Sequence, residues 1–141
     1  MPFFYMDYWY LILVVPALVV SLWAQFRVKS TFSKYSNKGV GCGMTGARAS
    51  QYIQQSNGIQ VSVQPIAGEL SDHFDPRSNV IRLSTPVYDR ATVAAVGVAA
   101  HETGHALQHA EGYGPVKLRT KMVPVTNFAS GLSPILIIAG I

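Results

Sequence analysis

The stretch Val98–His109, VAAHETGHALQH, places two histidines four residues apart with a glutamate directly after the first. On an α-helix, residues four apart lie on one face about one turn along the axis, so His101 and His105 project together. Glu102 lies to one side of them. The preceding turn is rich in alanine and valine, and a buried imidazole or carboxylate is costly unless it is paired or bound to a metal. The stretch therefore favours a metal-binding helix over a helix with two solvated histidines.

The chemistry of this pattern is specific. Zinc accepts imidazole nitrogens and, in catalytic sites, keeps one position open for water. In the H-E-x-x-H pattern the two histidines hold the ion and the glutamate is the general base. We therefore predict that His101 and His105 bind Zn²⁺. Glu102 would take a proton from the activated water and pass it to the leaving amine of a cleaved peptide bond.

The third metal ligand has no single candidate. His109 lies about 12 Å from His101 along a straight helix. Glu111 has the spacing of the last ligand in one class of metalloproteases, but Gln108 replaces the glycine that turns the chain back there. Three upstream residues are alternatives: Asp72, His73 and Asp75. No Asp, Glu, His or Cys follows Glu111, and we favour a third ligand that is missing from this chain.

An apolar N-terminal segment predicts a membrane anchor. Charged residues make up 13% of the chain, against about 25% in an average soluble domain. Residues 9–26 carry no formal charge, have aromatic residues near both ends, and are just long enough to span a bilayer as a helix. Pro16 is tolerated in such a helix. Basic residues follow the segment and no small-residue cleavage site does, which favours a retained anchor over a cleaved signal peptide.

Basic clusters flank the predicted membrane segments. The first contains Arg27, Lys29, Lys34, Lys38 and Arg48, and the second Lys117, Arg119 and Lys121. By the positive-inside rule, they place the domain between them on the cytoplasmic side of the inner membrane and residues 1–8 outside. Neither cluster is interleaved with aromatic residues in a binding pattern, so nucleic-acid binding is not expected. Residues 126–141 resemble a transmembrane helix cut in the middle, and we expect an incomplete chain.

The remaining sequence predicts a small α+β domain over residues 45–122, joined to the anchor by residues 27–44. Thr45 is the predicted N-cap of a helix that stops at residues 57–58, Asn-Gly. The single cysteine, Cys42, cannot form an internal disulfide, so the fold requires no oxidising compartment.

Two short strands and one long helix are predicted after this point. Residues 59–63 alternate apolar and polar side chains, and residues 80–83 read VIRL. We expect these strands to pair in a small antiparallel sheet, with residues 68–79 as a polar loop between them. A helix that opens at Pro86 should carry the histidine motif without a break and end near Glu111.

The segments PALVVSLWAQFRVKSTFSKYS (residues 16–36) and LSDHFDPRSNVIRLSTPVYDRATVAAVGVAAHETGHALQHAEGY (residues 70–113) resemble the YugP-like bacterial membrane zinc metallopeptidases. The resemblance covers essentially the whole chain. It implies a minimal zincin-like fold, with a small sheet over the active-site helix and transmembrane helices attached. It also implies that the two motif histidines are zinc ligands and the motif glutamate the base. Family members are longer, and a downstream glutamate is their third ligand, as in gluzincins.

The resemblance includes a polar signature, Asp72, His73, Asp75 and Arg77. We expect it to fix its loop through turn hydrogen bonds, with lining of the cleft as the alternative. In such folds an extended peptide can add to a sheet edge above the metal, and we predict residues 80–84 as that edge.

Two functions follow from the sequence. The first is a membrane-anchored zinc endopeptidase that acts on peptide or protein substrates, including membrane-associated segments. The alternative is a non-catalytic, membrane-tethered zinc-binding scaffold with an incomplete site, which the lack of a third ligand favours.

Overall fold

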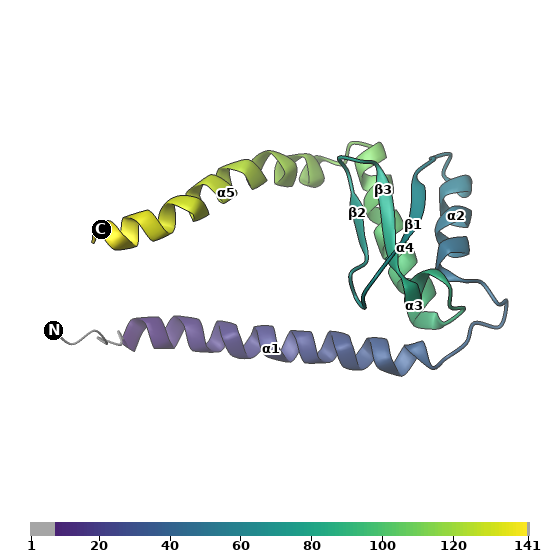
Figure 1. Ribbon diagram of the computed structural model, residues 1–141, viewed down its shortest axis with the longest axis horizontal. Coiled ribbons are helices and arrows are strands. Elements are labelled where there is room, and N and C mark those ends of the chain that lie inside the picture. Colours follow the sequence, from purple (N-terminus) through teal and green to yellow (C-terminus); the bar gives the residue numbers. More distant parts are fainter. Residues whose placement is uncertain (1–7, 141) are drawn as a thin grey trace.

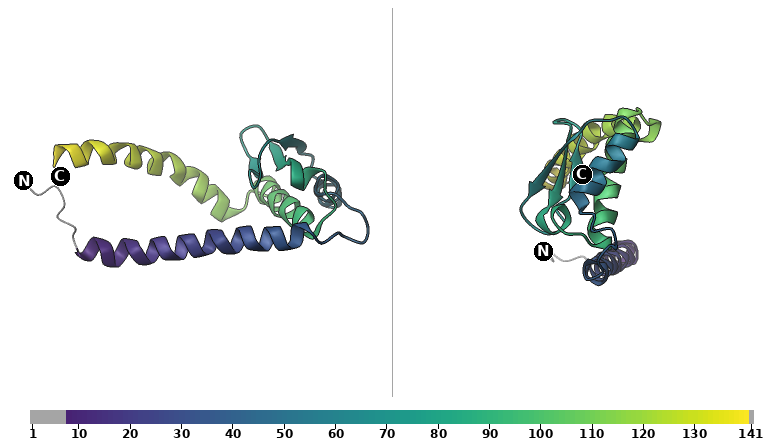
Figure 2. Two further views of the ribbon diagram at one scale, coloured as in Figure 1. Left: turned by 60° about the horizontal axis from the view of Figure 1, so that its bottom comes forward. Right: turned by 90° about the vertical axis from the view of Figure 1, so that its right-hand side faces the viewer.

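Two long helices project from a small mixed domain in the computed structural model, which describes residues 8–140 (Figure 1). Helix α1 (Tyr8–Ser36) leads into the domain and α5 (Gly114–Ala139) leaves it. Both extend to the same side of the domain in Figures 1 and 2. The fold is α+β with two apolar helices, as predicted. The predicted outer tail lies almost wholly outside the described residues.

Helix α1 is longer than the predicted membrane segment. It continues without a break from residue 26 to Ser36, because none of the residues between them is a proline or glycine. The stretch Leu11–Ser36 is long and apolar enough to cross a membrane, and none of its most apolar window is buried. The predicted connector therefore begins as helix and becomes irregular only after Ser36.

Helix α5 also contains a stretch long and apolar enough to cross a membrane, none of it buried. It begins at Gly114, with Pro115 in its first turn, where a missing N–H costs nothing. Residues 126–139 are thus the second half of a helix that starts well before them. The second basic cluster lies inside α5, in its first two turns.

Helix α2 (Gly46–Ser56) begins and ends where the sequence predicts. The Thr45 hydroxyl accepts a hydrogen bond from Arg48 N at 3.3 Å, which caps the helix. Asn57 is the C-cap, and Gly58 follows with φ 65°, a left-handed conformation that glycine adopts without strain.

The sheet has three strands in the order β1-β3-β2. β3 (Val80–Ser84) is the second predicted strand, and β1 (Ser62–Ile66) begins three residues after the predicted start of the first at residue 59. The two strands pair in parallel, so the predicted antiparallel pairing is wrong. The reason is a third strand, β2 (His73–Asp75), inside the predicted polar loop. β2 and β3 form an antiparallel hairpin, which turns β3 to run in the same direction as β1. β3 is therefore the central strand and not the predicted edge.

The predicted helix from Pro86 is also corrected. A short helix, α3 (Thr85–Tyr88), is separated from α4 (Val93–Ala110) by residues 89–92. Thr92 caps α4, since its hydroxyl accepts a hydrogen bond from Ala95 N at 3.2 Å. The connector also pairs with this gap: Val93 N donates to Lys38 O at 2.8 Å. Helix α4 ends at Ala110, as predicted near Glu111.

The core lies where α4 packs against the sheet and α2. Its fully or almost fully buried members are Ile81, Leu83, Val87, Ala95, Ala99 and Ala106. Helix α2 packs so closely against α3 that a Cβ at Gly46 would overlap the carbonyl oxygen of Val87. Between α2 and α4 the hydroxyls of Ser50 and Thr103 hydrogen-bond at 2.7 Å, and both residues are fully buried. The core thus fixes α4 on its alanine side and leaves its opposite side for the site.

Candidate metal centre

The histidine pair lies in the middle of α4, on the face turned away from the core. The buried positions of this helix are small, including Ala95, Ala99 and Ala106. His101 is exposed, and His105 and Glu102 are half-buried. The helix therefore presents its polar groups to the cleft while its small residues let the sheet and α2 approach.

The two imidazoles converge on one point. His101 Nε2 and His105 Nε2 are 3.1 Å apart, and the rings meet edge to face with centroids 4.6 Å apart. Two imidazole nitrogens bound tetrahedrally to one zinc ion at 2.0–2.1 Å would be separated by about 3.3 Å. The distance between the two nitrogens thus fits a single zinc ion.

Gln108 orients one of these rings. His105 Nδ1 lies 3.1 Å from Gln108 Oε1. An amide oxygen only accepts, so Nδ1 carries the proton and Nε2 keeps its lone pair for a metal. In the sequence, Gln108 stands out only as the residue in place of a turning glycine. Its spacing, three residues after His105 on a helix, was the signal that could have identified this contact.

Glu102 is held by the edge strand. Its Oε2 accepts a hydrogen bond from Phe74 N, in β2, at 3.1 Å. Among the described residues Glu102 takes part in no ion pair. The carboxylate is therefore fixed beside the histidine pair and retains capacity to accept a proton.

The polar signature of the β1–β3 region mostly supports its own loop. Asp72 Oδ1 accepts hydrogen bonds from Ser84 N at 2.7 Å and from Ser84 Oγ at 3.0 Å. His73 Nδ1 donates to Ser71 O at 2.8 Å. These contacts agree with the predicted structural role and tie β2 to the end of β3.

Asp75 organises the turn between β2 and β3. The Ser78 hydroxyl and Arg77 N donate to its carboxylate, and Arg82 forms an ion pair with it at 3.3 Å. These hydrogen bonds, that of Ser78 first, lower the pKa of Asp75 from 3.8 to about 2. The carboxylate of Asp75 therefore stabilises this turn.

The remaining candidates for a third ligand lie apart from the pair. The ring of His109 packs against Phe74, with centroids 5.7 Å apart, and Glu111 is the C-cap of α4. Across residues 8–140, no group of three His, Cys, Asp or Glu side chains is placed to hold a metal ion. Among the described residues the candidate centre therefore has two possible ligands, both from α4.

A cleft of about 570 Å³ lies beside this centre and is lined by Glu102 and His105 but not by His101. It lies between β2 with its following turn, the motif face of α4 and the first half of α5. Glu102 and His105 line it together with Phe74, Arg77 and Arg119. The cleft is large enough for several residues of a bound polypeptide.

Comparison with known proteins gives two matches. Residues 10–141 match the model of a family described as "Putative neutral zinc metallopeptidase". The chain is also 49% identical, over 132 residues, to a Bacillus subtilis protein named "Putative membrane protease YugP". That alignment covers 93% of this chain but 59% of the relative, so the chain spans less than two thirds of the relative's length. No solved structure matches the chain.

Proposed function

Because the chain belongs to this family of neutral zinc metallopeptidases, we propose that it provides the metal-binding helix of a membrane-anchored zinc endopeptidase. His101 and His105 would hold the ion, and Glu102 would be the general base. The observation that carries the proposal is the 3.1 Å approach of the two Nε2 atoms beside the fixed Glu102 carboxylate.

Each residue has a separate task in this mechanism. A zinc ion at the histidine pair would polarise the scissile carbonyl and make water more acidic. Glu102 accepts the proton of the attacking water and returns it to the amine as the peptide bond breaks. The Phe74 N–H keeps the carboxylate in place for both transfers. Gln108 keeps the His105 ring in the tautomer that offers Nε2.

We also propose that the domain lies at the cytoplasmic face of the inner membrane, with the bilayer around α1 and α5. Apart from Arg48, which lies in α2, the members of both basic clusters lie at the domain ends of these helices or directly beyond. Three of their members, Arg27, Lys29 and Lys34, follow the uncharged part of α1, and Lys117, Arg119 and Lys121 precede that of α5. The positive-inside rule supports this orientation. A peptide or protein substrate would occupy the cleft between β2, α4 and α5.

Replacement of the general base tests the enzymatic proposal. The Glu102→Gln chain, purified with its two apolar helices in detergent, should retain zinc and lose hydrolysis of labelled peptides by a factor of about 10² to 10⁴. Zinc content by metal analysis and cleavage by fluorescence are the two measurements. Undiminished hydrolysis in this variant would remove Glu102 from the mechanism.

The two-ligand centre favours one second function, a zinc-binding membrane scaffold. Catalytic zinc sites commonly have three protein ligands, and the described residues provide two. Zinc bound at the histidine pair without hydrolysis of any peptide, with Glu102 present, would support the scaffold over the peptidase.

A further inference from the structure

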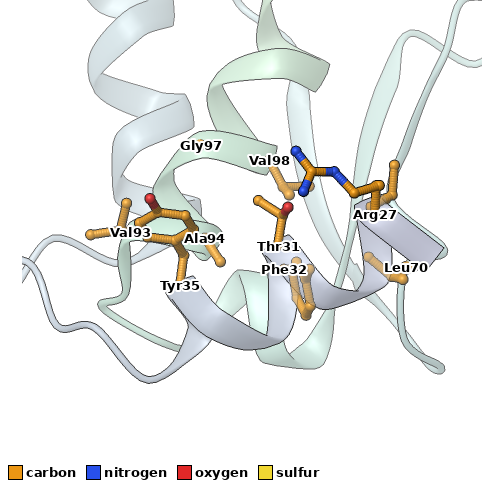
Figure 3. Close-up of a pocket in the computed structure, with 10 residues that line it drawn as sticks. Arg27, Thr31, Phe32, Tyr35, Leu70, Val93, Ala94, Gly97 and Val98 are labelled. Carbon is orange, nitrogen blue, oxygen red and sulfur yellow. The ribbon is translucent and has the colours of Figure 1, made fainter. Parts of the chain in front are cut away.

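A second cavity lies next to the metal centre, between α1 and the first turns of α4 (Figure 3). Its volume is about 480 Å³. Apolar side chains from both helices form its walls, among them Val28, Phe32 and Tyr35 of α1 and Val93 and Val98 of α4. Leu70, from the loop between β1 and β2, closes one end near Arg27 (Figure 3). Arg27 is the only charged residue in the lining.

The cavity and the metal centre share one face of α4. On a helix, Ala94, Val98, His101 and His105 fall within about 60° of the circumference. Val98 precedes His101 by three residues, about 4.5 Å along the axis. A polypeptide held at the histidine pair would therefore have its neighbouring side chains at the mouth of this cavity.

The position of the cavity argues against a lipid chain as its occupant. The part of α1 that lines it, from Arg27 to Tyr35, also carries Lys29 and Lys34. Three cations over this length are costly inside a hydrocarbon layer, so this part of α1 lies outside it. A lipid would have to withdraw a tail from the bilayer to fill the cavity, whereas a bound polypeptide already lies beside it.

We propose that this cavity is a specificity pocket that binds an apolar side chain of the polypeptide substrate, close to the bond that is cleaved. The proposal rests on the proposed peptidase function and adds a substrate preference to it. Leucine and phenylalanine are the side chains that suit the lining. Apart from Arg27, Thr31 and Tyr35 the lining side chains have no polar atoms, so a polar side chain would lose its water there for few hydrogen-bond partners.

Gly97 and Thr31 allow the pocket to be filled from opposite walls. A Cβ built at Gly97 meets no atom within 4 Å, so a larger side chain there enters the cavity without displacing the backbone. Thr31 is exposed on the facing side of α1. Leucine is also a better helix former than either residue, so Gly97→Leu and Thr31→Leu should keep both helices intact.

Gly131→Leu is the matched control. Gly131 lies in α5, its Cβ would also meet no atom within 4 Å, and it lines no described cavity. The same change is thus made on another helix, away from the pocket.

The experiment measures binding, so that it does not depend on turnover. Each variant is made in the full chain with Glu102→Gln, in detergent with zinc. Fluorescence anisotropy then gives the dissociation constants of short labelled peptides in which serine, alanine, leucine or phenylalanine is moved along one sequence. We expect leucine and phenylalanine at one position to bind at least about tenfold more tightly than serine. Gly97→Leu and Thr31→Leu should each abolish that preference without weakening the serine peptide, and Gly131→Leu should preserve it.

An unchanged preference in both filled variants would overturn the proposal. The proposal would also be overturned if both filled variants bound less spin-labelled phosphatidylglycerol than the unfilled chain while their peptide binding stayed the same. The pocket would then hold lipid. The chain with Glu102 separates this proposal from the peptidase function. Hydrolysis without any apolar preference would refute the pocket alone, and an apolar preference that the filled variants abolish, without hydrolysis, would refute the peptidase alone.

Discussion

The two faces of α4 differ in what their residues do. One face is made of small residues such as Ala95, Ala99 and Thr103, which let α2 and the sheet pack within contact distance. The other carries His101, His105 and Gln108, which hydrogen-bond to one another. Glu102, which accepts a hydrogen bond from β2, lies at the border between the two faces. The packing residues and the histidine pair are thus separated by roughly 150° around one helix. A substitution on either face should therefore affect one property and spare the other.

The largest effect on the chemical face should come from loss of a ligand. His105→Ala removes one of two imidazoles, and zinc affinity should fall on the order of a hundredfold to a thousandfold. Thermal unfolding of the metal-free chain should change little, because His105 is only half-buried. Zinc titration by calorimetry and melting followed by circular dichroism check the two parts. Loss of the fold in the metal-free variant would contradict the separation of the two faces.

Gly46→Ala should have the largest effect on the packing face. Its Cβ would overlap Val87 O and approach Ala95 O to 3.0 Å, and neither backbone group can move without shifting a helix. We expect a loss of about 1–3 kcal/mol in the free energy of unfolding. Urea denaturation measures it, with Gly97→Ala as a control because a Cβ there meets open space. Equal stability of the two variants would show that α2 does not pack as described.

A smaller effect on the chemical face is expected from Gln108→Leu. Without the amide oxygen the Nδ1 proton of His105 loses its partner, and zinc affinity should fall about 10- to 100-fold. Gln108→Glu should restore the affinity, because a carboxylate accepts the same hydrogen bond. An equal loss in both variants would mean that Gln108 acts through packing and not through His105.

The smallest effect is expected from Thr103→Val. The valine removes a buried hydroxyl that bonds Ser50 Oγ and Ala99 O, both at 2.7 Å. We expect a loss of about 1–2 kcal/mol in unfolding free energy and an unchanged zinc affinity. A large drop in zinc binding would show that the motif geometry depends on this buried contact.

Local patterns in the sequence predicted the local parts of the molecule. The helical spacing of His101 and His105 and the cap at Thr45 depend on residues within a few positions, and the structure has both geometries. The direction of β3 could not be predicted in this way, because it depends on β2. That strand has only three residues, too few for an alternation to identify it, and its pairing is decided by the turn around Asp75. The start of α4 at Val93 could have been predicted from the sequence, because Thr92 is a good N-cap.

The site shows the same division. Two imidazoles on one helix follow from spacing alone, whereas the contact between Glu102 and Phe74 joins segments 28 residues apart in sequence. The periodicity of apolar residues along the chain cannot predict such a contact. Gln108 lies between these cases, because its partner is local but its chemical role depends on which nitrogen faces the metal.

The tie between Glu102 and the Phe74 amide has a mechanical consequence. The carboxylate of Glu102, the proposed proton carrier, is positioned by a hydrogen bond from the opposite strand as well as by its own helix. Any sliding of β2 along α4 would move the carboxylate while both rings stayed in place. Lengthening the segment between β1 and β2 should therefore shift the Glu102 carboxylate and slow the proposed proton transfer, even though every motif residue is unchanged.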